Sequence, residues 1–63
     1  MDKYEEIKDL IKQCLELGNR KYGSNTQMND NFRADLEHIE WAYGNNVKRW
    51  KQELLEVIEE ETA

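Results

Sequence analysis

Apolar residues recur every three or four positions along two stretches of this 63-residue chain. This spacing places them on one side of an α-helix, with charged residues on the other side. In the first stretch we predict a helix from about residue 2 to residue 22, which ends before Gly23. Asp2 is its expected N-cap, and Glu5 three positions later completes a capping box. Its apolar face consists of Tyr4, Ile7, Leu10, Ile11, Cys14, Leu17 and Tyr22.

A polar segment, SNTQMNDN, follows this first helix. Its Asn, Asp, Ser and Thr side chains hydrogen-bond their own backbone and therefore favour turns. We predict a loop over residues 23–30. One of Asn29, Asp30 or Asn31 is then expected to cap the next helix.

The second apolar stretch keeps one helical phase on both sides of the triplet Gly44-Asn45-Asn46. At 100° per residue its apolar side chains fall within a sector of roughly 80°. They are Phe32, Leu36, Ile39, Tyr43, Val47, Trp50, Leu54 and Val57. Because the phase is shared, we predict one continuous helix from about residue 31 to residue 60. Gly44 inside it costs about 1 kcal/mol relative to Ala, which burial of its large neighbours offsets. The alternative is a break at Gly44–Asn46.

The two predicted helices have unequal lengths, about 30 Å and about 45 Å at 1.5 Å per residue. We therefore expect an all-α, single-domain chain over residues 1–63, a helical hairpin with a long second helix. Two copies would form an antiparallel four-helix bundle that covers the excess length. The alternative, a three-helix bundle broken at Gly44–Asn46, needs no second copy. The expected dimer or core seam consists of Tyr43, Val47, Trp50, Leu54 and Val57.

Trp41 lies on the side of the predicted long helix that faces away from the apolar stripe. Tryptophan is enriched among the residues that dominate protein interfaces, so we expect Trp41 to contact a partner. The alternative is that it packs on the first helix, or inside a three-helix core if the helix breaks at Gly44. The predicted partner-binding face consists of His38, Trp41, Asn45, Lys48 and Leu55.

The charge of the chain argues against contact with nucleic acid. Fourteen acidic and nine basic residues give a net charge of −5, whereas binding to phosphates needs cations that replace counterions. The cluster Val47-Lys48-Arg49-Trp50-Lys51 is locally basic, and a small DNA-binding regulator is the least favoured alternative. Outward carboxylates could instead imitate DNA and block a basic groove of a nucleic-acid enzyme.

Few residues in the chain could carry chemistry. Cys14 is the only cysteine, which excludes an intrachain disulfide, and Cys14 and His38 are too few soft ligands for zinc. The acid pairs Glu53 with Glu56 and Glu56 with Glu59 resemble those with which nucleotide pyrophosphatases of the MazG type hold Mg²⁺, and RKYG is similar to segments of helical phage nucleotide enzymes. The chain is too short for the helices of that fold. We expect no metal, no cofactor and no catalytic residue, and therefore no enzyme.

The remaining class is a protein that binds another protein. No apolar run is long enough to span a membrane, and we see no signal peptide. A lone thiol fits a reducing cytoplasm. We expect a non-enzymatic protein–protein interaction module, similar in character to small phage- or mobile-element-type inhibitors and regulators. Its amphipathic face with Trp41 would occlude a surface of a larger host protein.

Overall fold

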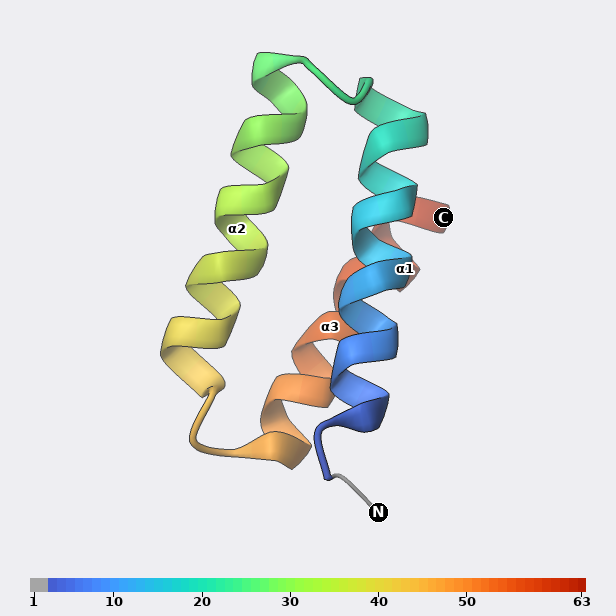
Figure 1. Ribbon diagram of the computed structural model, residues 1–63. Coiled ribbons are helices and arrows are strands. Elements are labelled where there is room, and N and C mark those ends of the chain that lie inside the picture. Colours follow the sequence, from blue (N-terminus) through green and yellow to red (C-terminus); the bar gives the residue numbers. More distant parts are fainter. Residues whose placement is uncertain (1–2) are drawn as a thin grey trace.

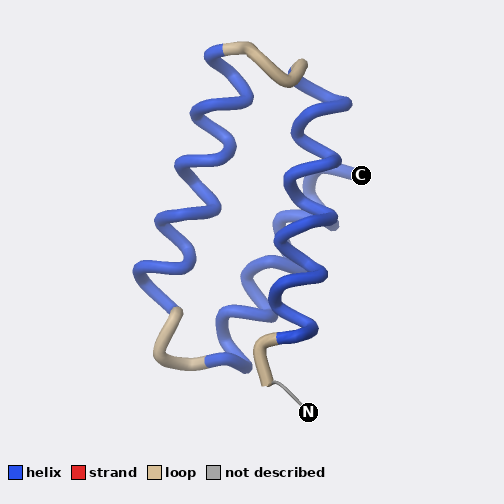
Figure 2. Tube along the Cα trace, viewed as in Figure 1, coloured by secondary structure: helices blue, strands red, loops and turns tan. Residues whose placement is uncertain are grey.

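Three helices make up most of the part of the chain that the structure describes, residues 3–63 of a computed structural model (Figures 1 and 2). Helix α1 spans Glu5–Tyr22, α2 spans Gln27–Tyr43 and α3 spans Val47–Thr62. No strand occurs within residues 3–63, so the prediction of an all-α chain is confirmed.

The helices run up, down and up along the molecule, and each packs against the other two. Helices α1 and α2 lie side by side and antiparallel, while α3 turns back and crosses behind α1 (Figure 1). The contact between α1 and α3 is the most extensive of the three. The resulting molecule measures 33 × 20 × 18 Å.

One hydrophobic core is shared by the three helices. Large apolar side chains buried in this way each contribute about 1.5–3 kcal/mol. The buried members are Ile7, Leu10 and Cys14 of α1, Phe32 and Leu36 of α2, and Trp50 and Leu54 of α3. Aromatic pairs close both ends of this core, with ring centroids 6.3 Å apart for Tyr4 and Trp50, and 5.6 Å apart for Tyr22 and Phe32.

The predicted continuous helix over residues 31–60 is wrong. Helix α2 ends at Tyr43 and a new helix begins at Val47, as in the alternative with a break at Gly44–Asn46. The shared phase of the apolar residues has another cause: α2 and α3 both face the same core. Two helices joined by a turn can therefore carry the pattern of one helix.

The local chemistry of Gly44-Asn45-Asn46 explains the break. The Gly44 N–H still donates to the Glu40 carbonyl at 2.7 Å. Asn46 is then extended, with φ of −130° and ψ of 92°, and its side-chain oxygen accepts the Arg49 N–H at 3.1 Å. Asparagine is among the preferred N-cap residues because it satisfies such an unpaired N–H group. Asn46 thus starts α3 instead of continuing α2.

The break also removes the reason for expecting a dimer. Trp50 is 8% exposed and Leu54 is fully buried within one chain. Tyr43, Val47 and Val57 are partly buried against the same core. The dimer was predicted in order to cover the excess length of a long second helix. This long helix is absent, so dimerisation stays a prediction that no longer has this argument behind it.

The loop before α2 is shorter than the predicted 23–30. Helix α2 begins at Gln27, and its N-cap is Thr26, not one of residues 29–31. The hydroxyl oxygen of Thr26 accepts the Asn29 N–H at 3.1 Å. The prediction chose the wrong cap because several neighbouring residues have the same capping chemistry.

The ends of α1 agree with the sequence only in part. Its end at Tyr22 is confirmed, and Gly23 follows with φ of 90°, a conformation that glycine adopts without a steric penalty. The predicted N-cap, Asp2, lies outside the described residues. In the described part, α1 starts at Glu5, and Tyr4 in the N-cap position makes no side-chain cap.

Helices α1 and α2 approach closely at Gly18. A Cβ atom there would lie 2.6 Å from a ring carbon of Phe32 and 2.7 Å from Oδ1 of Asn29. Asn29 is 1% exposed, and its Nδ2 donates to Oδ1 of Asn19 at 2.8 Å. The missing side chain at Gly18 therefore makes room for both a buried ring and a buried amide.

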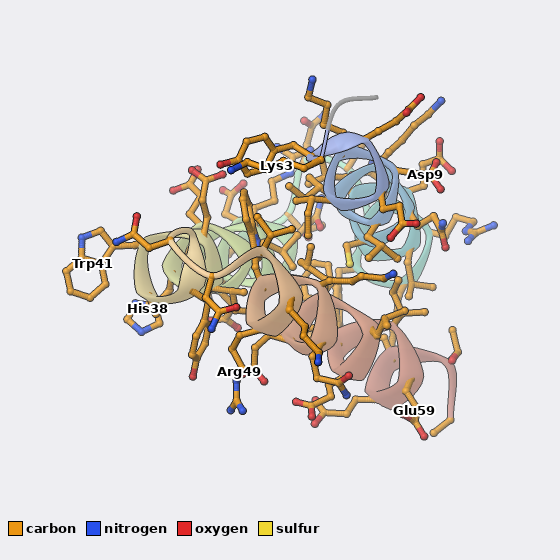
Figure 3. All side chains as sticks on the ribbon, turned by 90° about the horizontal axis from the view of Figure 1, so that it is seen from below. Lys3, Asp9, His38, Trp41, Arg49 and Glu59 are labelled. Atoms are coloured by element: carbon orange, nitrogen blue, oxygen red, sulfur yellow. The ribbon has the colours of Figure 1, made fainter. Side chains whose placement is uncertain are left out.

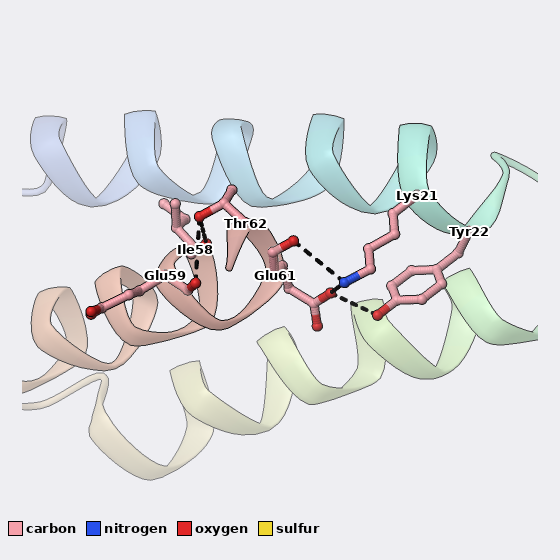
Figure 4. Close-up of polar contacts among 6 residues, drawn as sticks. All are labelled: Lys21, Tyr22, Ile58, Glu59, Glu61 and Thr62. Atoms are coloured by element: carbon pink, nitrogen blue, oxygen red, sulfur yellow. Dashed lines mark hydrogen bonds and ion pairs between the residues drawn. The ribbon is translucent and has the colours of Figure 1, made fainter.

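Glu61 ties the end of α3 to the end of α1 (Figure 4). Its carboxylate accepts hydrogen bonds from Lys21 Nζ and Tyr22 Oη, each at 2.7 Å. The bonds from Lys21 and then Tyr22 hold the pKa of the Glu61 carboxyl below its ordinary value. They also raise the pKa of Lys21 and of Tyr22. An anion that the helix dipole disfavours at a C-terminus is thereby stabilised.

The cap of α3 can be tested with adjacent asparagines. Asn46→Ala removes the acceptor of the Arg49 N–H and should lower the free energy of unfolding by about 1 kcal/mol. Asn45→Ala is the matched control, because Asn45 is exposed and caps no helix. Urea denaturation followed by circular dichroism measures both. Equal stability of the two variants would contradict the assigned cap.

The contacts of Glu61 should make stability depend on pH. A carboxyl whose pKa is lowered in the folded state adds to the free energy of unfolding, and it does so fully above its unfolded pKa of about 4.3. This stabilisation is lost as the pH falls through the folded pKa. Glu61→Gln should therefore be less stable than the parent at about pH 7 and equal to it at about pH 2.5. Glu60→Gln, at an exposed neighbour, should match the parent at both values. A Glu61→Gln deficit that persists in acid would refute the assignment.

Candidate protein-binding surface

Trp41 projects into solvent from the last turn of α2 (Figure 3). It is 83% exposed, because it lies five positions, or about 140° of helical rotation, beyond the core residue Leu36. His38, one turn earlier, stacks on it with ring centroids 6.0 Å apart and planes inclined by 26°. The pair forms an aromatic projection on the outer side of α2.

A shallow hollow beside this pair is lined by Ala34, Glu37, His38, Glu40 and Trp41. Within residues 3–63, the carboxylates of Glu37 and Glu40 form no ion pair. The exposed indole is therefore flanked by two uncompensated negative charges.

The same two carboxylates border a groove between α1 and α2. Its first part has a volume of about 230 Å³. The apolar side chains that line this part are Ile11, Leu15 and Leu36. A second part of about 530 Å³ shares Ile11 and Glu40 with the first and reaches Trp50 of α3. Glu37 and Glu40 thus form a ridge between the groove and the hollow beside Trp41.

The predicted partner-binding face is divided by the turn between α2 and α3. His38 and Trp41 are in contact on α2. Asn45 lies exposed in the turn itself, and Lys48 and Leu55 are exposed on α3, Leu55 at 41%. The structure brings together two of the five residues. The single helical face that joined all five depended on the continuous helix, which is absent.

The groove was not predicted from the sequence, although its two acids, Glu37 and Glu40, belong to the outward carboxylates that were. A groove between two helices depends on how they pack, which the phase of one helix does not reveal. One signal was available: Leu15, four residues after Ile11, widens the apolar face of α1 beyond the stripe that was assigned. Both side chains are only partly buried.

The basic cluster at the start of α3 is largely occupied within the chain. Arg49 lies 3.6 Å from the Glu53 carboxylate, and its guanidinium carbon is 5.3 Å from the centre of the Tyr43 ring. Lys51 pairs with Glu6 of α1. Two of the three cations of this cluster therefore have partners and are less available to phosphates.

The groups that could carry chemistry are few. Cys14 is buried, and burial raises the pKa of its thiol, which disfavours the reactive thiolate. No cluster of three or more His, Cys, Asp or Glu residues that could hold a metal occurs in residues 3–63. Over the same range, no helix combines the length and apolar character that a membrane crossing needs.

Comparisons of the chain with protein-family models, with curated proteins and with solved structures give no match. A functional proposal therefore depends on the geometry of the surface around Trp41.

The different environments of the two tryptophans can be measured separately. Trp41→Phe leaves the buried Trp50, whose emission should lie at shorter wavelength and resist quenching by iodide. Trp50→Phe leaves Trp41, which should emit at longer wavelength with a quenching constant several times larger. Circular dichroism controls for the fold of each variant. Equal quenching in two folded variants would contradict the assignment of Trp41 as exposed and Trp50 as buried.

Proposed function

We propose that this chain is a non-enzymatic protein-interaction module that docks the surface around Trp41 on a larger protein and so occludes it. The observation that carries the proposal is the 83% exposure of Trp41. Tryptophans that become buried at an interface often contribute about 2 kcal/mol or more to binding. Burial of so large an apolar side chain by a partner removes its surface from water, which stabilises the complex.

Two features of the surroundings support a binding role. The stacking of His38 on Trp41 restricts the indole, and a side chain that is ordered before binding loses less entropy when it binds. The groove between α1 and α2 adjoins the hollow beside Trp41 through Glu37 and Glu40. Indole and groove thus offer one partner a continuous surface.

The proposed class is a small inhibitor or regulator of the phage or mobile-element type, acting in the cytoplasm. A short acidic chain with one core and a buried lone thiol, Cys14, suits that class. The proposed partner is a different protein, since a core that is closed within one chain removes the uncovered helix for which a second copy was expected.

A DNA mimic is the second candidate, and one observation favours it. Helix α2 carries four carboxylates that form no ion pair within residues 3–63, namely Asp30, Asp35, Glu37 and Glu40. Such a mimic would bind a basic groove with an affinity that falls steeply with salt. A small DNA-binding regulator is less favoured, because Arg49 and Lys51 are already paired.

The proposal predicts that partner capture depends on Trp41. Tagged parent protein and Trp41→Ala are incubated with lysate of the host, and captured proteins are quantified by mass spectrometry. One protein should be retained by the parent. Trp41→Ala should bind this protein with an affinity about thirtyfold lower, which corresponds to a loss of about 2 kcal/mol of binding free energy.

Met28→Ala is the matched control, because Met28 is 63% exposed at the opposite end of α2. It should retain the partner like the parent, and all three proteins should show the same helical circular dichroism. Capture that is equal for Trp41→Ala and the parent, or equally weakened by both variants, would refute the proposal.

A further inference from the structure

We infer that the groove between α1 and α2 is the docking site for a cationic amphipathic helix of the protein partner. Its apolar face would enter the groove, and its lysines or arginines would meet Glu37 and Glu40. The inference rests on the proposed function, and it specifies the chemical class of the partner segment.

The first part of the groove is formed by α1 and α2 without α3. Helix α3 crosses behind α1 (Figure 1), and no α3 residue lines this first part. Ile11 and Leu15 remain partly exposed there. Helices that line an open groove commonly receive a further helix, whose side chains at i, i+3, i+4 and i+7 fill the apolar floor.

The shape of the groove favours a helix over an extended strand. Ile11 and Leu15 lie four positions apart on α1, and Leu36 and Glu40 lie four positions apart on α2. The lining therefore follows the axes of two helices. Addition of a strand needs an exposed sheet edge, and residues 3–63 contain no sheet.

The charge of α2, which forms one wall of the groove, favours a cationic occupant. With His38 neutral, the four carboxylates and one guanidinium of α2 give this helix a formal charge of −3. Glu37, Glu40 and Arg33 line the first part of the groove, which gives this part a formal charge of −1, while Lys8 and Glu40 line the second part. Arg33 donates to Asn19 Oδ1 at 3.3 Å, and neither Glu37 nor Glu40 forms an ion pair within residues 3–63.

Other occupants fit these charges less well. The phosphates of a nucleic acid would face the unpaired carboxylates of Glu37 and Glu40, and an acidic helix would be repelled in the same way. A second copy of the chain, with a net charge of −5, would bring its own acidic α2 towards the groove. Charge complementarity therefore points to a basic segment of a different protein.

The experiment uses the full chain and three labelled synthetic peptides of about five helical turns. One has leucines on a single helical face and lysines elsewhere. The second has glutamates in place of the lysines, and the third has the leucines and lysines in scrambled order. By fluorescence anisotropy the first should bind most tightly, with an affinity that falls as salt rises. The glutamate peptide should show no binding.

Two isosteric double variants locate the charge effect. The double variant Glu37→Gln with Glu40→Gln should lower the affinity for the leucine–lysine peptide about fivefold at low salt, as expected for the loss of two solvent-screened ion pairs. Glu56→Gln with Glu60→Gln makes the same change of net charge on exposed positions of α3 and should leave the affinity unchanged. Methyl resonances of Ile11 and Leu15 should shift on titration, while those of the exposed Leu55 should not.

Several outcomes would overturn the inference. These are equal binding of the glutamate or scrambled peptide, equal effects of the two double variants, or methyl shifts outside the groove. Shifts of Ile11 and Leu15 that grow with protein concentration alone, with a dimer in sedimentation, would assign the groove to a second copy. If the peptides fail while Trp41-dependent capture of a partner persists, the proposed function stands and only the partner class is wrong. If capture also fails, both are wrong.

Discussion

Burial of Trp50 and Leu54 against α1 requires a turn of three residues, Gly44 to Asn46, between α2 and α3. A straight continuation of α2 would carry both side chains away from α1 and into water. The extended backbone of Asn46 and its bond to the Arg49 N–H permit the reversal. The core shared by three helices and the part of the groove that reaches Trp50 both follow from it. A weak local preference therefore selects between two folds with the same hydrophobic pattern.

Features that depend on a single helix could be predicted from the sequence. Features that depend on how the helices pack against one another could not. The end of α1 at Tyr22 follows from Gly23, and the exposure of Trp41 follows from its angle to Leu36. The turn at Gly44–Asn46 was only the alternative prediction, because the apolar residues on both sides of it share a helical phase. Lys48 and Leu55 were assigned to the same face as Trp41 only because one continuous helix was assumed. The groove was invisible because it lies between α1 and α2.

The ion pairs are distributed unequally over the three helices. The ion pairs within residues 3–63 connect α1 with α3 or lie within α3: Lys21 with Glu61, Lys51 with Glu6, and Arg49 with Glu53. Helix α2 takes part in none of them. The carboxylates of α2 can therefore form ion pairs with another molecule without breaking the ion pairs that connect α1 with α3.

The contact of Glu61 with Lys21 and Tyr22 has a consequence for the layout of the molecule. It lies near the end of α1, whereas Trp41 lies in the last turn of α2, which runs antiparallel to α1. The C-terminus lies beside α1, on the side away from α2 (Figure 1). A protein joined after Ala63 would therefore leave the molecule away from the helix that carries Trp41, and the aromatic end would stay unobstructed.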